Sequence, residues 1–206
     1  EDWYFLSHRL ILARACHDLG WEVTVATRVE DHGSAIEREG FRVIPIRMHR
    51  RDRAPWKEIR SILELVLLLK RERPDILHQV GLKPVIYGCI AANLVRSPVV
   101  VSALAGMGYI FTSGHLRIRI ARMMIKKVLK VILRRQGNWL IVQNHSDAES
   151  IVGGRLISRD RITVIMGSGV DTDHFTYTPE PEGPITVAMV SRMLKDKGVR
   201  EVVLAA

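Results

Sequence analysis

Two cations near the end of the chain have types and spacing suited to binding phosphate. Arg192 and Lys197 stand five residues apart after the β-branched run 185–190, and Lys197 is followed by Gly198 and by residues 199–206, which resemble the first turns of a helix. Cations beside the free N–H groups of a helix N-terminus attract the negative charge of a diphosphate. The pattern predicts a diphosphate-binding turn. The alternative is a solvated surface turn with two ordinary cations.

A second cluster of polar residues lies between a predicted strand and a proline-rich segment. Residues 167–175 read Gly-Ser-Gly-Val-Asp-Thr-Asp-His-Phe. Gly167 and Gly169 allow the backbone to approach a ligand closely, and the carboxylate of Asp171 can accept hydrogen bonds. A tight turn with Asx-type hydrogen bonds explains the same residues without a ligand. We predict no metal site, because His174 and the two aspartates have no companion residues at ligand spacing.

Strand and helix patterns alternate along the chain and would position these residues. Strands are predicted at residues 21–27, 41–46, 75–78, 98–103, 139–142, 161–165 and 185–190. Helices are predicted at residues 7–19, 34–39, 55–70, 84–95, 115–135 and 199–206, with a further helix capped by Ser146 and Glu149. This order predicts an α/β fold with a Rossmann-like, doubly wound parallel sheet. Ligands of such sheets bind beyond the carboxyl ends of the strands.

A proline-rich segment divides the chain into unequal parts. Residues 176–184 contain three prolines and a glycine, which predicts a linker between a first domain at residues 1–175 and the start of a second domain at residues 185–206. The second part is too short to bury a core. The chain also opens on a loop and a helix where a doubly wound domain would be expected to place a central strand. We therefore expect a fold truncated at both ends.

Composition and charge limit the classes of protein to which this chain could belong. The 206 residues are 47% hydrophobic, and no apolar run approaches the roughly 20 residues that cross a bilayer. Cys16 and Cys89 are too few for a disulfide framework, which is typical of a reducing cytoplasm. The formal net charge is +9, and residues 115–135 contain eight Lys or Arg and no Asp or Glu.

Four separated blocks of the sequence together resemble family-4 glycosyltransferases of the GT-B fold. They are residues 1–10, which read Glu-Asp-Trp-Tyr-Phe-Leu-Ser-His-Arg-Leu, residues 78–88, residues 104–112, and the 167–175 turn with the linker and the Arg192–Lys197 turn. The second and third blocks are similar to a bacterial polysaccharide subgroup that transfers sugars onto lipid-linked or growing glycan acceptors. The resemblance implies a retaining-type glycosyltransferase, seen here as its N-terminal acceptor-side domain and the start of its nucleotide-sugar-binding domain.

The resemblance also implies roles for individual residues. Arg192 and Lys197 would hold the diphosphate of a nucleotide-sugar donor, expected to be UDP-linked, which is a co-substrate; no separate cofactor is expected. The donor side of the cleft would be lined by Gly167, Gly169 and Asp171. The acceptor side would be lined by Ser7, His8, Lys83, Gly106 and Gly108, with Lys83 exposed at a loop end. We name no catalytic residue, because the histidine that many family-4 enzymes carry after the strand at 98–103 is absent here.

The basic segment predicts contact with a membrane. On a helical wheel, one arc holds the cations Arg119, Arg122, Lys126, Lys127, Lys130 and Arg134. The opposite arc is apolar and includes Met124 and Val128. Such a helix can lie on anionic lipid, where each cation contributes about 1 kcal/mol, or pack on the sheet with a basic outer face. We expect a cytoplasmic protein at the inner membrane face with a lipid-linked saccharide acceptor. We expect no nucleic-acid partner, since no aromatic residues are interleaved with the cations.

Two alternatives stay open on the sequence alone. A sugar-nucleotide 2-epimerase of the same fold would need no acceptor and would release a free epimerised sugar. A non-catalytic, membrane-binding α/β module would bind vesicles and no nucleotide. We expect the 206-residue chain by itself to be inactive, because most of the donor-binding domain is absent from it.

Overall fold

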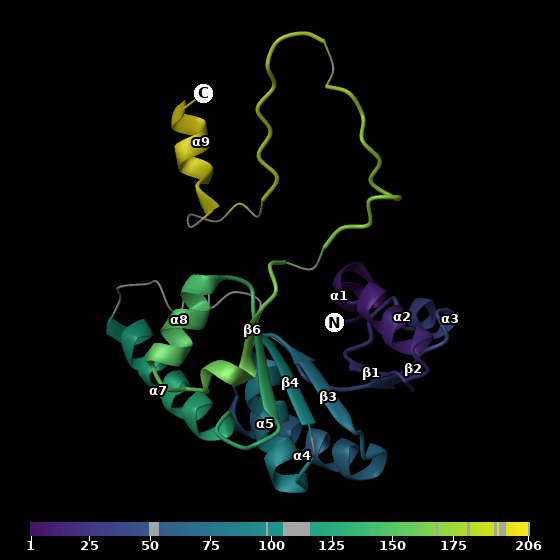
Figure 1. Ribbon diagram of the computed structural model, residues 1–206, viewed down its shortest axis with the longest axis vertical. Coiled ribbons are helices and arrows are strands. Elements are labelled where there is room, and N and C mark those ends of the chain that lie inside the picture. Colours follow the sequence, from purple (N-terminus) through teal and green to yellow (C-terminus); the bar gives the residue numbers. More distant parts are fainter. Residues whose placement is uncertain are drawn as a thin grey trace.

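The computed structural model alternates strands and helices along the chain, as the sequence predicts (Figure 1). It describes residues 1–49, 54–97, 99–104, 116–167, 169–180, 182–191, 193 and 197–205, with the backbone alone at 116–122. In the described part of the chain, no helix combines the length and the apolar content needed to cross a bilayer.

The strands are parallel and form two sheets. The smaller sheet pairs β1 (Thr24–Thr27) with β2 (Arg42–Pro45). The larger sheet has the order β3 (Ile76–Val80), β4 (Val99–Leu104), β5 (Asn138–Val142) and β6 (Ile162–Val164). Because every pairing is parallel, the carboxyl ends of the strands in a sheet lie at one edge. The predicted parallel α/β architecture is confirmed, although no pairing joins β1 to β3 among the described residues.

Helices connect the strands close to the predicted positions. Those beside the smaller sheet are α1 (Asp2–His8), α2 (Leu10–Asp18) and α3 (Gly33–Arg38). Those beside the larger sheet are α4 (Pro55–Glu72), α5 (Leu82–Val95), α7 (Leu116–Ile132), α8 (His145–Gly153) and the 3₁₀ turn Arg159–Arg161. The predicted helix at 7–19 is two helices that meet at Arg9.

The predicted cap of α8 is wrong by two residues. Asn144, not Ser146, is the N-cap, and its side-chain oxygen accepts a 2.7 Å hydrogen bond from the N–H of Asp147. Asn144 follows the end of β5 by two residues, so the helix begins as soon as a capping side chain is available. Ser146 lies inside the first turn.

Each sheet has its own hydrophobic core. The β3–β6 unit, residues 54–165 where described, buries a continuous cluster that includes Val85, Leu129, Leu133, Val142 and Ile151. The β1–β2 unit, residues 1–46, buries a smaller cluster of Ala13, Val25, Ile36 and Phe41. Polar groups join the two units: Arg42 pairs with Glu72, and the Glu64 carboxylate accepts a 3.0 Å hydrogen bond from the N–H of Arg47, in the segment between the units.

The segment after β6 leaves the sheets and is exposed almost throughout (Figure 1). The strand predicted at 185–190 is absent, and Ile185 and Val190 are 92% and 98% exposed. A strand needs a neighbouring strand to bond with, and none of the described residues supplies one there. The predicted final helix is confirmed as α9 (Val199–Ala205). The predicted domain boundaries stay a prediction.

Candidate functional site

Two of the residues selected from the sequence lie just beyond the carboxyl ends of strands, where parallel α/β sheets bind ligands. Lys83 follows β3, and Gly167 follows β6. In Figure 1, α1, which carries Ser7 and His8, lies on the side of the sheets toward which β6 runs. Gly106 and Gly108 follow β4 in sequence and lie outside the described residues.

Asp2 fixes α1 at this edge. Its fully buried carboxylate accepts 2.8 Å hydrogen bonds from the N–H groups of Trp3, Glu30 and His32, and its own N–H donates to the Arg28 carbonyl. Burial alone would raise the pKa of this carboxyl, but the three N–H donors outweigh it and lower the pKa to about 2. The segment after β1 and the start of α1 are thereby held together. The sequence signal was an acidic residue in the first turn of a helix.

Ser7 and His8 form a hydrogen-bonded pair at the exposed end of α1. Ser7 Oγ lies 2.6 Å from His8 Nδ1 and 2.9 Å from the Trp3 carbonyl oxygen. The hydroxyl has one proton, so both contacts are satisfied together when Nδ1 donates to Oγ and Oγ donates to the carbonyl. The His8 ring also stacks on Tyr4, with centroids 4.4 Å apart. This arrangement leaves Nε2 of a neutral His8 as an acceptor suited to a ligand hydroxyl.

Aromatic residues next to this pair were missed by sequence reasoning. Trp3 is 45% exposed and meets the Tyr4 ring edge to face at 5.8 Å. A ring face beside hydroxyl and imidazole groups suits a sugar, which presents C–H surface and hydroxyls together. The signal was the spacing of three and four residues between Tyr4 and the Ser7–His8 pair, which puts the three on one helix face.

Lys83 is held by neighbouring groups and is only 19% exposed in its side chain, so the expected exposure is wrong. Its Nζ donates to the His49 carbonyl at 2.7 Å and to Glu58 Oε1 at 3.0 Å. The Tyr87 hydroxyl donates to the other Glu58 oxygen, and burial followed by that contact raises the pKa of Tyr87. Lys83 therefore ties α5 to α4 and to the segment before α4. Whether it also contacts an acceptor stays a prediction.

The turn after β6 combines glycine conformations with a self-capping aspartate. Gly167 and Gly169 have φ of 78° and 74°, which side chains rarely adopt. Asp171 Oδ1 accepts hydrogen bonds from the N–H groups of Asp173 and His174 at 3.0 and 3.1 Å. This is the Asx-type turn that the sequence allowed as the alternative to a ligand site. Both glycines and Asp171 are exposed, so the turn remains accessible to a ligand.

The predicted diphosphate-binding turn is described only in part. Lys197 is exposed and precedes Gly198, whose φ is 76° and whose carbonyl accepts a hydrogen bond from the Val202 N–H in α9. Arg192 lies outside the described residues. Among the described residues, no three His, Cys, Asp or Glu side chains gather where they could hold a metal ion.

Helix α7 presents fewer cations to solvent than the helical wheel implied. Lys127 and Arg134 are exposed, whereas Lys126 and Lys130 are half-buried. Met124, expected on the packed arc, is 58% exposed. The side chains of Arg119 and Arg122 lie outside the described residues.

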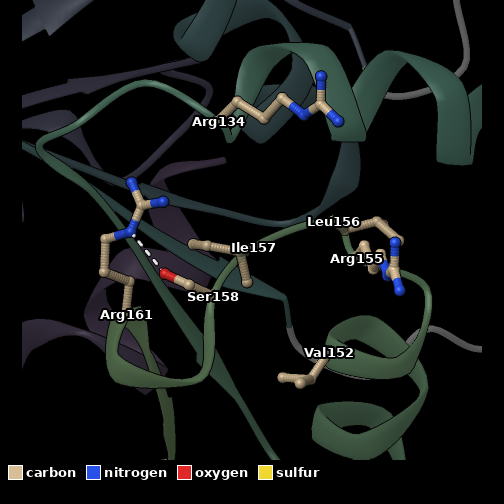
Figure 2. A pocket seen from close by; sticks show the side chains of 7 residues that line it. All are labelled: Arg134, Val152, Arg155, Leu156, Ile157, Ser158 and Arg161. Carbon is tan, nitrogen blue, oxygen red and sulfur yellow. Dashed lines mark hydrogen bonds between the residues drawn. The ribbon is translucent and has the colours of Figure 1, made fainter.

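A hollow of about 290 Å³ lies beyond the end of α7 (Figure 2). Arginines from three positions surround an apolar floor; the lining is Arg134, Val152, Arg155, Leu156, Ile157, Ser158 and Arg161. Arg161 donates to Ser158 Oγ at 2.9 Å and to the Arg135 carbonyl at 2.8 Å. These residues precede β5 and β6, so the hollow is at the amino edge of the sheet and is separate from the Ser7–His8 pair.

The chain is similar to known proteins in both sequence and fold. Residues 1–143 match the family described as "Glycosyl transferase 4-like". The chain is 22% identical over 179 residues to the capsular polysaccharide biosynthesis glycosyltransferase CapM of Staphylococcus aureus, covering 81% of this chain and 45% of the relative. It is 30% identical over 119 residues to the UDP-Gal:alpha-D-GlcNAc-diphosphoundecaprenol alpha-1,3-galactosyltransferase of Escherichia coli, covering 58% of this chain and 29% of the relative. The chain thus spans less than half the length of these relatives.

A solved structure shares the fold. The glycosyltransferase from Rickettsia africae ESF-5 superposes with a TM-score of 0.58 at 16% identity, covering 82% of this chain and 42% of that one. The resemblance drawn from the four sequence blocks and the GT-B type of fold are therefore confirmed. Since the family match extends over more than half of its residues, this chain belongs to the glycosyl transferase 4-like family.

Proposed function

We propose that the protein containing this chain transfers a sugar from a nucleotide-sugar donor to a lipid-linked or growing glycan acceptor in bacterial surface polysaccharide synthesis. The family match over residues 1–143 carries the proposal. The names of two relatives add to it, because one acts in capsular polysaccharide biosynthesis and the other uses UDP-Gal and a diphosphoundecaprenol-linked acceptor. The donor of this protein is accordingly a UDP-linked sugar, and no separate cofactor is required.

The proposed acceptor subsite is the surface of α1. Ser7, His8 and Trp3 offer a hydroxyl, an imidazole acceptor and a ring face within one helix, which fits a saccharide. Lys83, Gly106 and Gly108 would complete this side of the cleft.

The proposed donor subsite is formed by the turn after β6 and the Arg192–Lys197 turn. Gly167, Gly169 and Asp171 would line it. Two cations bound to the diphosphate would stabilise the negative charge that develops on the leaving nucleoside diphosphate.

The reaction would take place at the cytoplasmic face of the membrane, where a lipid-linked saccharide presents its sugar to a peripheral protein. Support comes from the exposed cations Lys127 and Arg134 at the outer side and end of α7. Nucleic acid is not a proposed partner.

The test is transfer by the full-length protein. We expect a panel of UDP-sugars with undecaprenyl-diphosphate-linked saccharides to give a lengthened lipid-linked product and equimolar UDP. Arg192→Ala should lower kcat/KM by about 100-fold or more, since it removes a donor to the developing charge. Arg200→Ala, a matched change on the exposed side of α9, should leave it unchanged.

Two outcomes would overturn the proposal. One is that no donor in the panel yields product or UDP. The other is release of a free epimerised sugar in the absence of any acceptor, which indicates the epimerase.

A further inference from the structure

The hollow beyond the end of α7 is lined by arginines that no described carboxylate neutralises (Figure 2). Arg134, Arg155 and Arg161 come from the end of α7, the segment after α8 and the 3₁₀ turn before β6. None of them forms an ion pair with a described residue, and no Asp or Glu is among the described residues that line the hollow. Elsewhere in the chain, Arg14 and Arg42 are each paired with a glutamate. The hollow therefore carries a positive charge that a ligand could neutralise.

Arg161 is held in one orientation by neutral acceptors. Its Nε donates to Ser158 Oγ at 2.9 Å, and its Nη1 donates to the Arg135 carbonyl at 2.8 Å. The Ser158 hydroxyl in turn donates to the Asp160 carboxylate, and this contact lowers the pKa of Asp160. The second terminal nitrogen of Arg161, Nη2, has no hydrogen-bond partner among the described residues. Because the guanidinium plane is already fixed, little conformational freedom is lost when Nη2 binds a ligand.

The floor of the hollow is apolar and belongs to the larger core. Leu156 and Ile157 are 3% and 5% exposed and are members of the core cluster, and Val152 packs against that cluster. Gly154 allows the Leu156 side chain to lie close to the backbone, since a Cβ at Gly154 would be 2.6 Å from Leu156 Cδ1. In Figure 2, the three arginines surround Ile157. The hollow thus combines a rigid apolar floor with a cationic rim.

This combination selects for a particular ligand chemistry. Guanidinium groups bind phosphate through paired hydrogen bonds, and several of them around one site favour a group with more than one negative charge. The apolar floor favours a ligand whose phosphate is attached to a ring or a hydrocarbon chain. The volume of about 290 Å³ fits a small molecule.

We propose that this hollow binds a phosphate monoester with a planar or apolar body. The phosphate oxygens accept hydrogen bonds from the three arginines, and the body lies against Leu156 and Ile157. A nucleoside monophosphate, with its flat base, and an alkyl phosphate share this chemistry. The hollow is at the amino edge of the sheet, so this site is distinct from the proposed donor and acceptor subsites and does not depend on the proposed function.

Titration of the ¹⁵N-labelled 206-residue chain, followed by NMR, tests the proposal with simple probes. We expect phenyl phosphate to shift the amide resonances of residues 152–161. It should bind about tenfold more tightly than inorganic phosphate, because its ring covers part of the apolar floor. Phenol, which lacks the charge, should not bind. Parallel titrations with UMP and hexyl phosphate then show which of the two bodies the floor prefers, and tighter binding of either one than of inorganic phosphate supports the proposal.

Two matched variants test the role of the arginines. Arg155→Gln removes a guanidinium group from an exposed position on the rim and should weaken the binding of phenyl phosphate about tenfold. Arg159→Gln is the control, because Arg159 is exposed in the same 3₁₀ turn as Arg161 but does not line the hollow. At about 150 mM salt, where charges more than about 8 Å apart are largely screened, it should weaken binding less than about twofold. A third variant, Arg192→Ala/Lys197→Ala, removes the proposed diphosphate-binding turn and should leave the shifts at residues 152–161 unchanged.

The proposal is wrong if phenyl phosphate leaves the resonances of residues 152–161 in place, or if it binds no more tightly than inorganic phosphate. It is also wrong if Arg155→Gln and Arg159→Gln weaken binding equally, since the effect would then be one of overall charge. Loss of binding in Arg192→Ala/Lys197→Ala alone would assign the phosphate to the other turn. Circular dichroism and thermal unfolding check that each variant is folded.

Discussion

The two units of this molecule are stabilised by different interactions. The β3–β6 unit buries a cluster of seventeen residues between its sheet and helices, whereas the cluster of the β1–β2 unit has four among the described residues. The smaller unit relies in addition on polar contacts: the buried Asp2 carboxylate and the ion pair of Arg14 with Glu39 at 2.7 Å. The proposed acceptor subsite on α1 is therefore held in place by the three hydrogen bonds to the Asp2 carboxylate, here called the Asp2 clamp, more than by a large hydrophobic core.

This contrast matters because the candidate site draws on both units. Ser7 and His8 belong to the smaller unit, and Lys83 and the turn after β6 belong to the larger one. The smaller unit should therefore open more readily, since local stability follows buried apolar contacts. Its motion would move Ser7 and His8 relative to the rest of the cleft.

The largest expected effects on stability come from truncating a large buried side chain in either hydrophobic core. Leu129→Ala, at a fully buried site in the larger core, should lower the free energy of unfolding by about 2–5 kcal/mol, and Phe41→Ala in the smaller core by about 3–5 kcal/mol within its own unit. Amide hydrogen exchange distinguishes the two. Phe41→Ala should speed exchange at Val25 and Val43 and leave Leu140 protected. Equally faster amide exchange in both sheets of Phe41→Ala would show that the two units unfold together.

A change to the Asp2 clamp should have a smaller, pH-dependent effect. The pKa of this carboxyl is about 2 in the folded protein and about 3.9 in an unfolded chain. A lowered pKa adds stability that is fully present above about pH 4 and is lost as the pH falls through about 2. At pH 7 we expect Asp2→Asn to cost about 1–2 kcal/mol, less than the full shift would give because the surrounding loop is solvated.

Urea unfolding at several pH values measures this effect. The wild type and Asp2→Asn should converge as the pH approaches 2. Glu30→Gln, which changes a neighbouring carboxylate but keeps the N–H bound to Asp2, is the control and should track the wild type. A constant difference between the wild type and Asp2→Asn at every pH would mean that the clamp does not act through charge.

The strand and helix order could be predicted from the sequence because the signals are local. β-Branched runs identified β4 and β5, and Pro55 marked the first residue of α4. Gly20 directly follows the helix predicted at residues 7–19, and its φ of 82° is typical of the residue after a helix. The strand at 185–190 failed because a strand depends on a partner that its own residues do not specify.

The surroundings of the candidate side chains could not be predicted, because they depend on residues distant in sequence. Lys83 was expected to be exposed at a loop end, but Glu58, 25 positions earlier, binds it. Asp2 is held by N–H groups 28 and 30 positions later. The exposure of Leu63 and Leu67 on α4 could not be predicted either, since periodicity reveals an apolar face without showing whether another element covers it.

The smallest expected effect on stability is at Lys83, where the larger unit contacts the segment that joins the two units. Lys83→Met removes the charge that faces Glu58 and the hydrogen bond to the His49 carbonyl. A double-mutant cycle with Glu58→Gln should give a coupling of about 0.5–1 kcal/mol in thermal unfolding, as for a partly buried ion pair. Arg60→Met, at an exposed site in α4, is the matched control and should show no coupling to Glu58→Gln. Zero coupling for Lys83 would mean that its charge is available to a ligand, and the acceptor role would then be the better account of this residue.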